Sequence, residues 1–340
     1  MHTRHAMPAA DDLAFVNGWQ RQFPLCETPF ATLAQAQGCS PEQVLAMCRR
    51  LQANGLLGRI GAVFAPGAGG ASTLAAMAVP PERLEAVAAI VSAHPGVNHN
   101  YERESAINLW FVMTGPDATT MEADLQGLET ATGLPVLRLP MVRPYRIDLA
   151  FNLESPQIAA GGRTRTAQAP VAPQETGLAA LAEQGLPLQP RPFDAWAQVL
   201  GWETPRVLST LQRWLDQGTL SRFGMVVRHH EAGYTANAMT VFDVPDAIVD
   251  ALGDVLAHQS GVTLAYRRAR APGWPYNLYC MVHGQERTQV LALIRQAMDR
   301  CALAGYPHQV LFSLRRFTQR GARRFSAHTA CSTPPEAAHV

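Results

Sequence analysis

Two stretches of the sequence combine residue types that bind or protonate an anion. In RFGMVVRHHEAGY, Arg222 to Tyr234, an arginine precedes two histidines, Arg228, His229 and His230. An imidazole has an unperturbed pKa of about 6.5 and can donate a proton at neutral pH, so His229 is the first candidate for a general acid and His230 the second. Their consecutive positions lack the spacing of a metal site, and we expect none. The alternative is that they are solvated loop residues.

The second stretch, AYRRARAPGWPYNLYCMVHG, runs from Ala265 to Gly284. Guanidinium groups bind carboxylates through two hydrogen bonds, and aromatic rings beside them favour a flat, polycarboxylated ligand. Strand alternation places Tyr266 and Arg268 on one face and Arg267 on the other. The alternative is that the aromatic residues belong to the core and the asparagine satisfies a strand end. Tyr266 is a third catalytic candidate, and the substrate-binding candidates are Arg228, Arg267, Arg268, Trp274, Tyr276, Asn277 and His283.

The chain carries this pattern twice, which indicates an internal duplication. RRLQANGLLGRIGAVF and QRWLDQGTLSRFGMVV align with Gly61 on Gly224, and NYERESAINLWF echoes the second stretch. The first copy keeps His99, Tyr101 and Arg103 but places glutamates among them, and APGAGGA stands where the second has RHHEAGY. We therefore expect the ligand site in residues 178–340 and, for the first half, a supporting role in folding or in the pairing of the halves.

The elements that position these residues follow one order in each half. A short helix, a turn and a second helix from about Pro41 to Ala53, with Ser40 as N-cap, lead into the hairpin-like RIGAVF, as in a winged helix. A βαββαβ order follows, which predicts a ferredoxin-like domain. The predicted fold is α+β, a tandem winged helix-turn-helix plus ferredoxin-like duplication that resembles Lrp/AsnC-type regulators paired as a pseudo-dimer. The expected boundaries are 11–66, 72–151, a flexible linker at 152–177, 178–230 and 234–325.

Composition excludes several classes of function. All 28 basic residues are arginine, which excludes Schiff-base lysines, pyridoxal-phosphate enzymes and Walker-type P-loops. The six cysteines show no CxxC or metal spacing, and neither a long apolar run nor a signal-like start is present, so we expect a cytoplasmic protein without membrane contact. Its net charge of +1 divides into an acidic first half and a basic second half.

The helix-turn-helix pattern raises DNA binding as a rival function. A recognition helix needs exposed cations for the phosphates, and the helices near 41–53 and 205–217 offer few. We expect no specific DNA binding and interpret these domains as a scaffold. The alternative is an Lrp/AsnC-type transcription regulator that senses a small ligand or a tetrapyrrole.

The quoted motifs, on the doubled plan, resemble the two subunit types of sirohaem decarboxylase fused in one polypeptide. The resemblance implies removal of two acetate carboxylates from sirohaem, giving 12,18-didecarboxysirohaem for haem d1 or alternative haem biosynthesis. It implies no cofactor, since the iron belongs to the substrate, and an intramolecular pairing of the halves. A higher oligomer, paralogous subunits and other pathway enzymes are open as partners. The family usually has a His-Cys or similar polar pair before the tyrosine of the second unit, where Thr263, Leu264 and Ala265 stand here.

Overall fold

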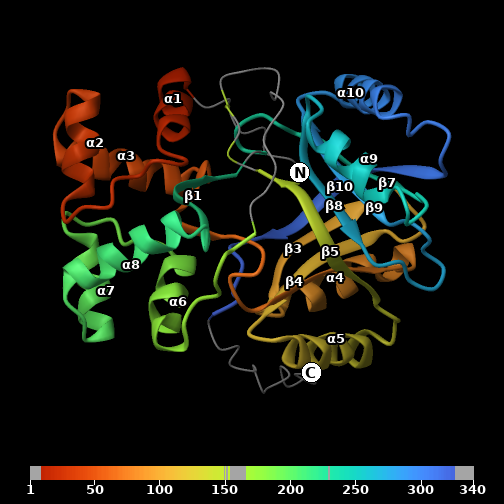
Figure 1. The fold of residues 1–340 in the computed structure, drawn as a ribbon, viewed down its shortest axis with the longest axis horizontal. Coiled ribbons are helices and arrows are strands. Elements are labelled where there is room, and N and C mark those ends of the chain that lie inside the picture. Colours follow the sequence, from red (N-terminus) through yellow and green to blue (C-terminus); the bar gives the residue numbers. More distant parts are fainter. Residues whose placement is uncertain (1–8, 149, 151, 154–165, 229, 326–340) are drawn as a thin grey trace, which may run out of the picture.

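The computed structural model describes residues 9–148, 150, 152–153, 166–228 and 230–325. Figure 1 shows the helix-turn-helix units of both halves side by side at one side of the molecule, and a strand-rich body flanked by helices at the other. No helix in these ranges is long and apolar enough to cross a membrane.

Each winged helix consists of three helices and one strand. The first contains α1 (Ala10–Gly18), α2 (Pro29–Gln37), α3 (Pro41–Ala53) and β1 (Leu57–Phe64), and the second contains α6 (Thr176–Gln184), α7 (Pro192–Leu200), α8 (Thr204–Asp216) and β6 (Leu220–Val227). The predicted helix at 41–53 is confirmed. Ser40 and Gln43 form a reciprocal capping box at its start, which satisfies two backbone N–H groups that would otherwise lack partners.

The strand that was expected to form a hairpin pairs instead with its counterpart in the other half. Strands β1 and β6 form a two-stranded antiparallel sheet with Gly61 opposite Gly224. A Cβ on Gly61 would lie 2.7 Å from the carbonyl of Ala182, and one on Gly224 would lie 2.4 Å from that of Gln20. The repeated glycine therefore admits a closely crossing chain in each half.

Each half continues into a ferredoxin-like unit. The first unit contains β2 (Ala71–Met77), η1 (Pro81–Arg83), α4 (Leu84–Ala93), β3 (Val97–Arg103), β4 (Leu109–Gly115), α5 (Ala118–Thr132) and β5 (Leu137–Ile147). The second contains β7 (Ala236–Phe242), α9 (Val249–Ala257), β8 (Val262–Arg268), β9 (Leu278–Gly284), α10 (Arg287–Arg300) and β10 (His308–Gln319). Both agree with the predicted βαββαβ order.

The two four-stranded sheets join edge to edge into a closed eight-stranded barrel, in the order β10-β3-β4-β2-β5-β8-β9-β7. The last strand of each unit crosses to the other: β10 pairs first with β7 and then with β3, and β5 pairs first with β2 and then with β8. We call the β10–β3 contact the first seam and the β5–β8 contact the second seam. The predicted pseudo-dimer is thus a single barrel built by both halves.

The strand directions give the barrel two different ends. The connections between β3 and β4 and between β8 and β9 lie together at one end, here called the hairpin end. Strands β2 and β7, which follow the winged helices, begin at the other end, here called the winged-helix end. The starts of β3 and β8 and the end of β10 lie at the winged-helix end as well.

Separate cores support these layers. One fills the winged helices, and two lie between the outer faces of the sheets and their helices. A fourth fills the barrel interior with aromatic and aliphatic side chains, among them Trp110, Tyr266, Trp274 and Tyr279. These buried side chains fill that part of the barrel with a packed core.

The described part of the predicted flexible linker is packed against the protein. The backbone N–H groups of Ala167 and Val171 donate to the carbonyls of Pro66 and Ala68, and Val171 packs on the winged-helix core. A short 3-10 helix, η2 (Pro173–Glu175), leads into α6, which begins before the expected boundary. Ala167 also packs on the winged-helix core, although the segment has no hydrophobic periodicity that would predict such contacts. Residues 154–165 lie outside the described ranges.

Candidate active site

Polar side chains gather at the first seam, at the winged-helix end of the barrel. Arg316 of β10 lies directly opposite Tyr101 of β3 in the strand register. The ring of His99 stacks on Tyr101 with their centroids 6.2 Å apart, and Arg316 Nη1 donates to Gln319 Oε1 at 3.0 Å. Because β10 crosses from the second unit to the first, residues more than 200 positions apart meet here.

The connection between β6 and β7 brings a carboxylate to the same place. Glu231 Oε1 lies 2.6 Å from Arg316 Nη2, with the Glu231 side chain only 10% exposed. The backbone N–H of Arg228 donates to the carbonyl of Leu56, and those of Glu231 and Ala232 donate to the carbonyl of Arg228. This turn anchors the connection to the first winged helix and aims Glu231 at β10.

Burial and positive charge control the protonation of this group. Burial, together with the charge of Arg316, lowers the pKa of His99 to about 4, so its imidazole is neutral at neutral pH. Burial raises the pKa of Tyr101, although the charges of Arg103 and Arg316 oppose the shift. The site therefore offers a neutral imidazole and a phenol O–H beside cations, which suits an anionic ligand.

The second seam lacks this group. Tyr266 takes the place of Tyr101, but Pro144 lies opposite it where Arg316 lies opposite Tyr101. Leu264 occupies the position of His99, and Ala68 aligns with Glu231. Among the residues that the structure describes, the two-fold repeat thus gives this polar group at one seam, and both halves contribute to it. Sequence reasoning assigned the site to residues 178–340 alone, because the pairing of β10 with β3 leaves no local sequence signal.

Three predicted residues lie at this end of the barrel. Arg228 and His230 belong to the β6–β7 connection; the His230 side chain is 51% exposed, with Nδ1 3.7 Å from Glu231 Oε2. His283, near the end of β9, places Nδ1 2.8 Å from Thr263 Oγ1. The first-choice acid, His229, lies outside the described residues. In the described part of the chain, no three His, Cys, Asp or Glu side chains are grouped to hold a metal ion.

Four other predicted residues lie inside the barrel: Tyr266 at the level that Tyr101 has in the other half, and Arg268, Trp274 and Tyr276 nearer the hairpin end. Tyr266 stacks on Tyr279, with centroids 5.8 Å apart, and Arg268 lies over the Tyr266 ring at 4.5 Å. Arg268 Nη1 donates to the carbonyl of Leu139 at 2.6 Å. Trp274 donates through Nε1 to the Tyr279 hydroxyl and contacts the Tyr276 ring. These residues mostly pack among themselves.

A small cavity lies beside them. Its volume is about 270 Å³, and the connections at the hairpin end line it: Ser105, Ala106, Ile107, Gly273, Trp274, Pro275, Tyr276 and Gln309. It lies at the opposite end of the barrel from Arg316 and Glu231.

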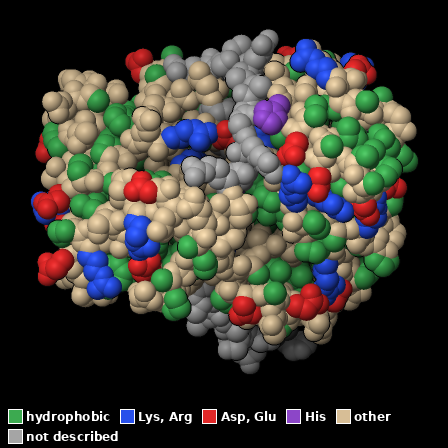
Figure 2. Space-filling model, viewed as in Figure 1, with side chains coloured by type: hydrophobic (Ala, Val, Ile, Leu, Met, Phe, Trp, Pro, Cys, Tyr) green, Lys and Arg blue, Asp and Glu red, His purple; other side chains and the backbone are tan. Residues whose placement is uncertain are grey.

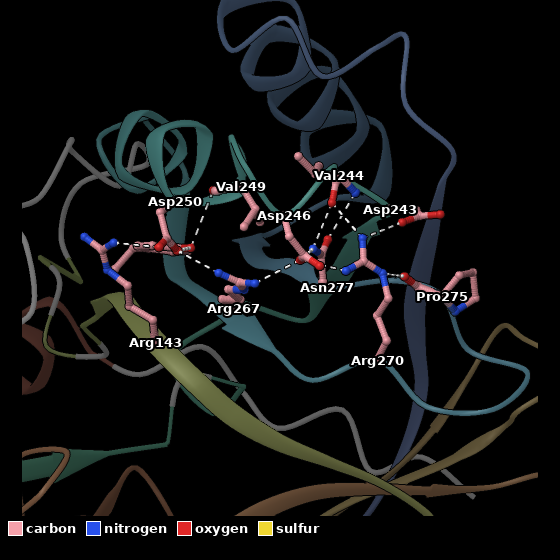
Figure 3. Close-up of polar contacts among 11 residues, drawn as sticks. Arg143, Asp243, Val244, Asp246, Val249, Asp250, Arg267, Arg270, Pro275 and Asn277 are labelled. Carbon is pink, nitrogen blue, oxygen red and sulfur yellow. Dashed lines mark hydrogen bonds and ion pairs between the residues drawn. The ribbon is translucent and has the colours of Figure 1, made fainter.

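The remaining two, Arg267 and Asn277, face outward. Figure 3 shows a row of alternating charges in which Arg267 bonds Asp246 at 2.9 Å and lies 3.7 Å from Asp250. Asn277 bonds the backbone of Val244 through both atoms of its amide, as Asn108 does with Val79 in the first unit. Asn277 therefore satisfies a strand end, as the alternative interpretation held. The predicted separation of Arg267 from Tyr266 and Arg268 is confirmed.

Comparisons with known proteins identify the family. The model described as "Siroheme decarboxylase NirDL-like HTH domain" matches residues 12–57 and 178–220, and "AsnC-like ligand binding domain" matches 68–146 and 231–318. The sirohaem decarboxylase NirDL subunit of Paracoccus pantotrophus is 44% identical over 92% of this chain and 96% of its own length. That of Paracoccus denitrificans is 41% identical over the same shares. The chain belongs to the sirohaem decarboxylase family.

Solved structures of this family agree with the fold. A crystal structure of sirohaem decarboxylase NirDL, and one of its co-complex with an iron-uroporphyrin III analogue, each match with a TM-score of 0.66 over 93% of this chain and 94% of theirs. Their sequence identities are 27% and 28%. Sirohaem decarboxylases also occur as separate subunits: NirL of Stutzerimonas stutzeri is 47% identical over 44% of this chain and 89% of its own length.

Within the sirohaem decarboxylase fold, sequence reasoning missed Tyr101, His99, Arg316 and Glu231 as members of one site. Tyr101 and His99 were noted but assigned to support. A signal for Arg316 existed in the repeat itself, because the position aligned by strand register is Pro144 in the other half. Arg316 has no matching arginine on β5, although the two strands are otherwise duplicated. Such a difference between the repeats indicates a residue that serves one half only.

Proposed function

We propose that this protein removes the two acetate carboxylates of sirohaem to give 12,18-didecarboxysirohaem, in haem d1 or an alternative haem biosynthesis. The observation that carries the proposal is the near-full-length match to sirohaem decarboxylases, at 44% identity over 92% of the chain. The solved relative in complex with an iron-uroporphyrin III analogue supports a tetrapyrrole ligand for this fold.

The chemistry requires a proton and an ordered set of cations. When the bond between the acetate methylene and its carboxylate breaks, CO2 leaves and the electron pair stays on the methylene carbon and the ring. A proton then converts the methylene to a methyl group. Cations that fix the other carboxylates orient the ring system, and groups that stabilise the developing charge lower the barrier. Arg316, Arg228 and the phenol of Tyr101 are the residues at the polar end of the barrel that suit these tasks.

His229 is our proposed proton donor, with His230 as second choice. His230 follows Arg228 beside Glu231, which supports a place for this segment near the substrate. His229→Ala and His229→Gln should still bind sirohaem, as judged by its absorption, and lose about 100-fold or more in single-turnover rate. Full activity in either variant would contradict the role. Loss of binding with an unchanged single-turnover rate would indicate that His229 only contacts a propionate or the iron.

Substrate contacts are assigned by position. Arg228 and His283 lie at the polar end, and we propose that they contact the substrate with Tyr101. Tyr266, Arg268, Trp274 and Tyr276 form the barrel interior behind it, while Arg267 and Asn277 bond within the protein on the outer face. We propose no cofactor beyond the iron that sirohaem itself carries.

The rival function, a DNA-binding regulator, is opposed by the state of the arginines in the winged helices. Arg50 bonds Asp12, Arg213 bonds Glu175, and Arg49 donates to the carbonyl of Leu188. Figure 2 shows basic and acidic side chains interspersed on the face in view, without a continuous basic surface. Phosphate binding needs free cations along one face. Micromolar, salt-sensitive and sequence-selective binding to a neighbouring promoter would favour the regulator.

Anaerobic incubation of the purified protein with sirohaem tests the proposal directly. Mass spectrometry should show the loss of two CO2 units and no other change. Sirohaem that remains intact, although it binds, would contradict a decarboxylase and leave a haem-binding carrier as the function.

A further inference from the structure

The ion pair between Arg316 and Glu231 is unusual for a site that receives an anion. A carboxylate within the site repels carboxylates of the ligand, which opposes binding unless that carboxylate has a separate task. Arg316 Nη2 and Glu231 Oε1 are 2.6 Å apart, and the two side chains are 29% and 10% exposed. Gln319 is the other hydrogen-bond partner of Arg316 among the described residues.

The repeat shows that barrel closure does not need this pair. At the second seam, β5 and β8 pair over five register positions with Pro144 in the place of Arg316. Ala68 aligns with Glu231, so both members of the pair are absent together from the other half. A contact needed only to close a seam would be expected at both seams. Its occurrence at the polar one links it to the ligand.

We propose that Arg316 binds a carboxylate of the substrate, and that Glu231 holds its place in the free protein and is exchanged on binding. This inference rests on the proposed function for the identity of the substrate, a polycarboxylated tetrapyrrole. In the free protein Glu231 keeps the guanidinium paired, close enough to Tyr101 for its charge to act on that phenol. The incoming carboxylate takes over the charge-assisted bond with Arg316.

Glu231 has other side chains within reach after the exchange. His230 Nδ1 lies 3.7 Å from Glu231 Oε2 before any movement. Arg228 and Glu231 also approach the same point, because a Cβ on Gly55 would lie 3.7 Å from both Arg228 Nη1 and Glu231 Cγ. The displaced carboxylate therefore turns toward Arg228 and His230 of its own segment and does not remain buried without a partner.

Two variants with opposite expected effects on ligand affinity test the exchange. Binding of iron-uroporphyrin III, followed by absorption titration, should be about 10-fold tighter in Glu231→Gln, because the competitor for Arg316 is removed. It should be at least about 10-fold weaker in Arg316→Gln, where a charge-assisted bond to the ligand is lost. In the Arg316→Gln background, Glu231→Gln should tighten binding much less than about 10-fold, because only its repulsion of the ligand is then removed and no exchange at Arg316 remains.

Matched controls come from the neighbouring residue. Arg315 is adjacent to Arg316 but bonds Glu102 and Glu85 on the outer face. Arg315→Gln and Glu102→Gln make the same charge changes and should leave binding of the probe within about 2-fold. If Arg316→Gln does not fold, Arg316→Lys replaces it and should weaken binding less than the loss of the charge.

Weaker or unchanged binding in Glu231→Gln would overturn the exchange and leave the pair as a structural contact. The titration needs no turnover, so a protein that binds the probe as expected but leaves sirohaem intact would contradict the proposed function alone. A protein that decarboxylates sirohaem while Glu231→Gln binds the probe no tighter would contradict the exchange alone.

Discussion

Two buried arginines occupy equivalent positions inside the barrel, and their bonds cross the seams. Arg103 Nη1 donates to the carbonyl of Leu311 at 3.0 Å, and Arg268 Nη1 to that of Leu139 at 2.6 Å. Each acceptor belongs to the crossing strand of the other half. Burial lowers the pKa of Arg103 to about 10, which leaves it charged at neutral pH. We expected Arg268 to bind the substrate and Arg103 to support the fold. Their equivalent bonds do not distinguish the two residues in this way.

Arg103→Met and Arg268→Met should therefore act alike. Each leaves a carbonyl of a crossing strand without its charged donor, so each should lower the free energy of unfolding by about 1.5–3 kcal/mol in urea titrations. The substrate-binding role first assigned to Arg268 makes a different prediction. It would be restored if Arg268→Met lost sirohaem binding at unchanged stability while Arg103→Met only unfolded more easily.

His99 predicts a pH dependence of stability. Its pKa is about 4 in the folded protein and about 6.5 when unfolded, so between these values only the unfolded chain binds the proton. Above pH 6.5 His99 is neutral in both states and its full contribution to the free energy of unfolding is present. As the pH falls from 6.5 toward 4, protonation of the unfolded chain lowers this free energy by at most about 1.4 kcal/mol per pH unit. Urea unfolding at several pH values should show this slope in the native protein and a shallower one in His99→Gln. Equal slopes would refute the assignment.

The residues of the site differ in how far the sequence could predict them. Strand alternation correctly separated Arg267 from Tyr266 and Arg268, because a period of two is local. Asn277 was correctly recognised as a possible strand-end residue. The meeting of Arg316 with Tyr101 depends on the register of a strand from the other half, with irregularities on both sides of their pairing, and no local pattern encodes it.

At the scale of elements, the crossing strands carry side chains of one half into the core of the other. Tyr145, on β5 of the first unit, packs in the core of the second unit and donates to Asp250 at 2.6 Å. Burial, together with this bond, raises the pKa of Tyr145. Its ring lies against Gly253 of α9, where an added Cβ would be 2.2 Å from the ring. The glycine provides the space that the second seam requires.

Gly253→Ala should therefore destabilise the protein despite the better helix propensity of alanine. Forcing the Tyr145 ring away overpacks the core, and we expect a loss of about 1–3 kcal/mol in the free energy of unfolding. Gly127→Ala in α5 is the matched control, because nothing lies within 4 Å of its added Cβ. That change should be neutral or stabilising by up to about 1 kcal/mol. Similar effects of both changes would show that the contact with Tyr145 is unimportant.

The helices and strands themselves were largely predictable, since their signals are local. The capping residue, the proline at the first position and the glycine after the helix placed α3 correctly. The pairing of β1 with β6, and the packing of residues 166–175, were missed. Both depend on contacts between segments far apart in the sequence. The local sequence instead indicated a hairpin at β1 and a flexible linker at residues 166–175.

At the scale of the molecule, strands of both halves build the barrel, and we predict that it does not need the covalent link between them. Sirohaem decarboxylases with separate NirD and NirL subunits match about half of this chain each. A protease site inserted between residues 158 and 162, then cleaved, should leave two fragments that migrate as one particle in size-exclusion chromatography and retain sirohaem turnover. Fragments that separate at micromolar concentration would show that the linker maintains the pairing.

The crossing of β10 onto β3 also has a consequence during synthesis on the ribosome. The edge of β3 has no partner until residue 319 has been made, so a completed first half emerges with its backbone N–H and C=O groups unpaired along that strand. An unpaired edge readily pairs with a foreign chain. The nascent first half must therefore persist, exposed to aggregation or chaperone capture, for roughly 10 s or more while the second half is translated. Because the two halves are fused, β10 is translated as part of the same polypeptide as β3. The strand that completes the β3 edge is therefore always supplied by the same chain.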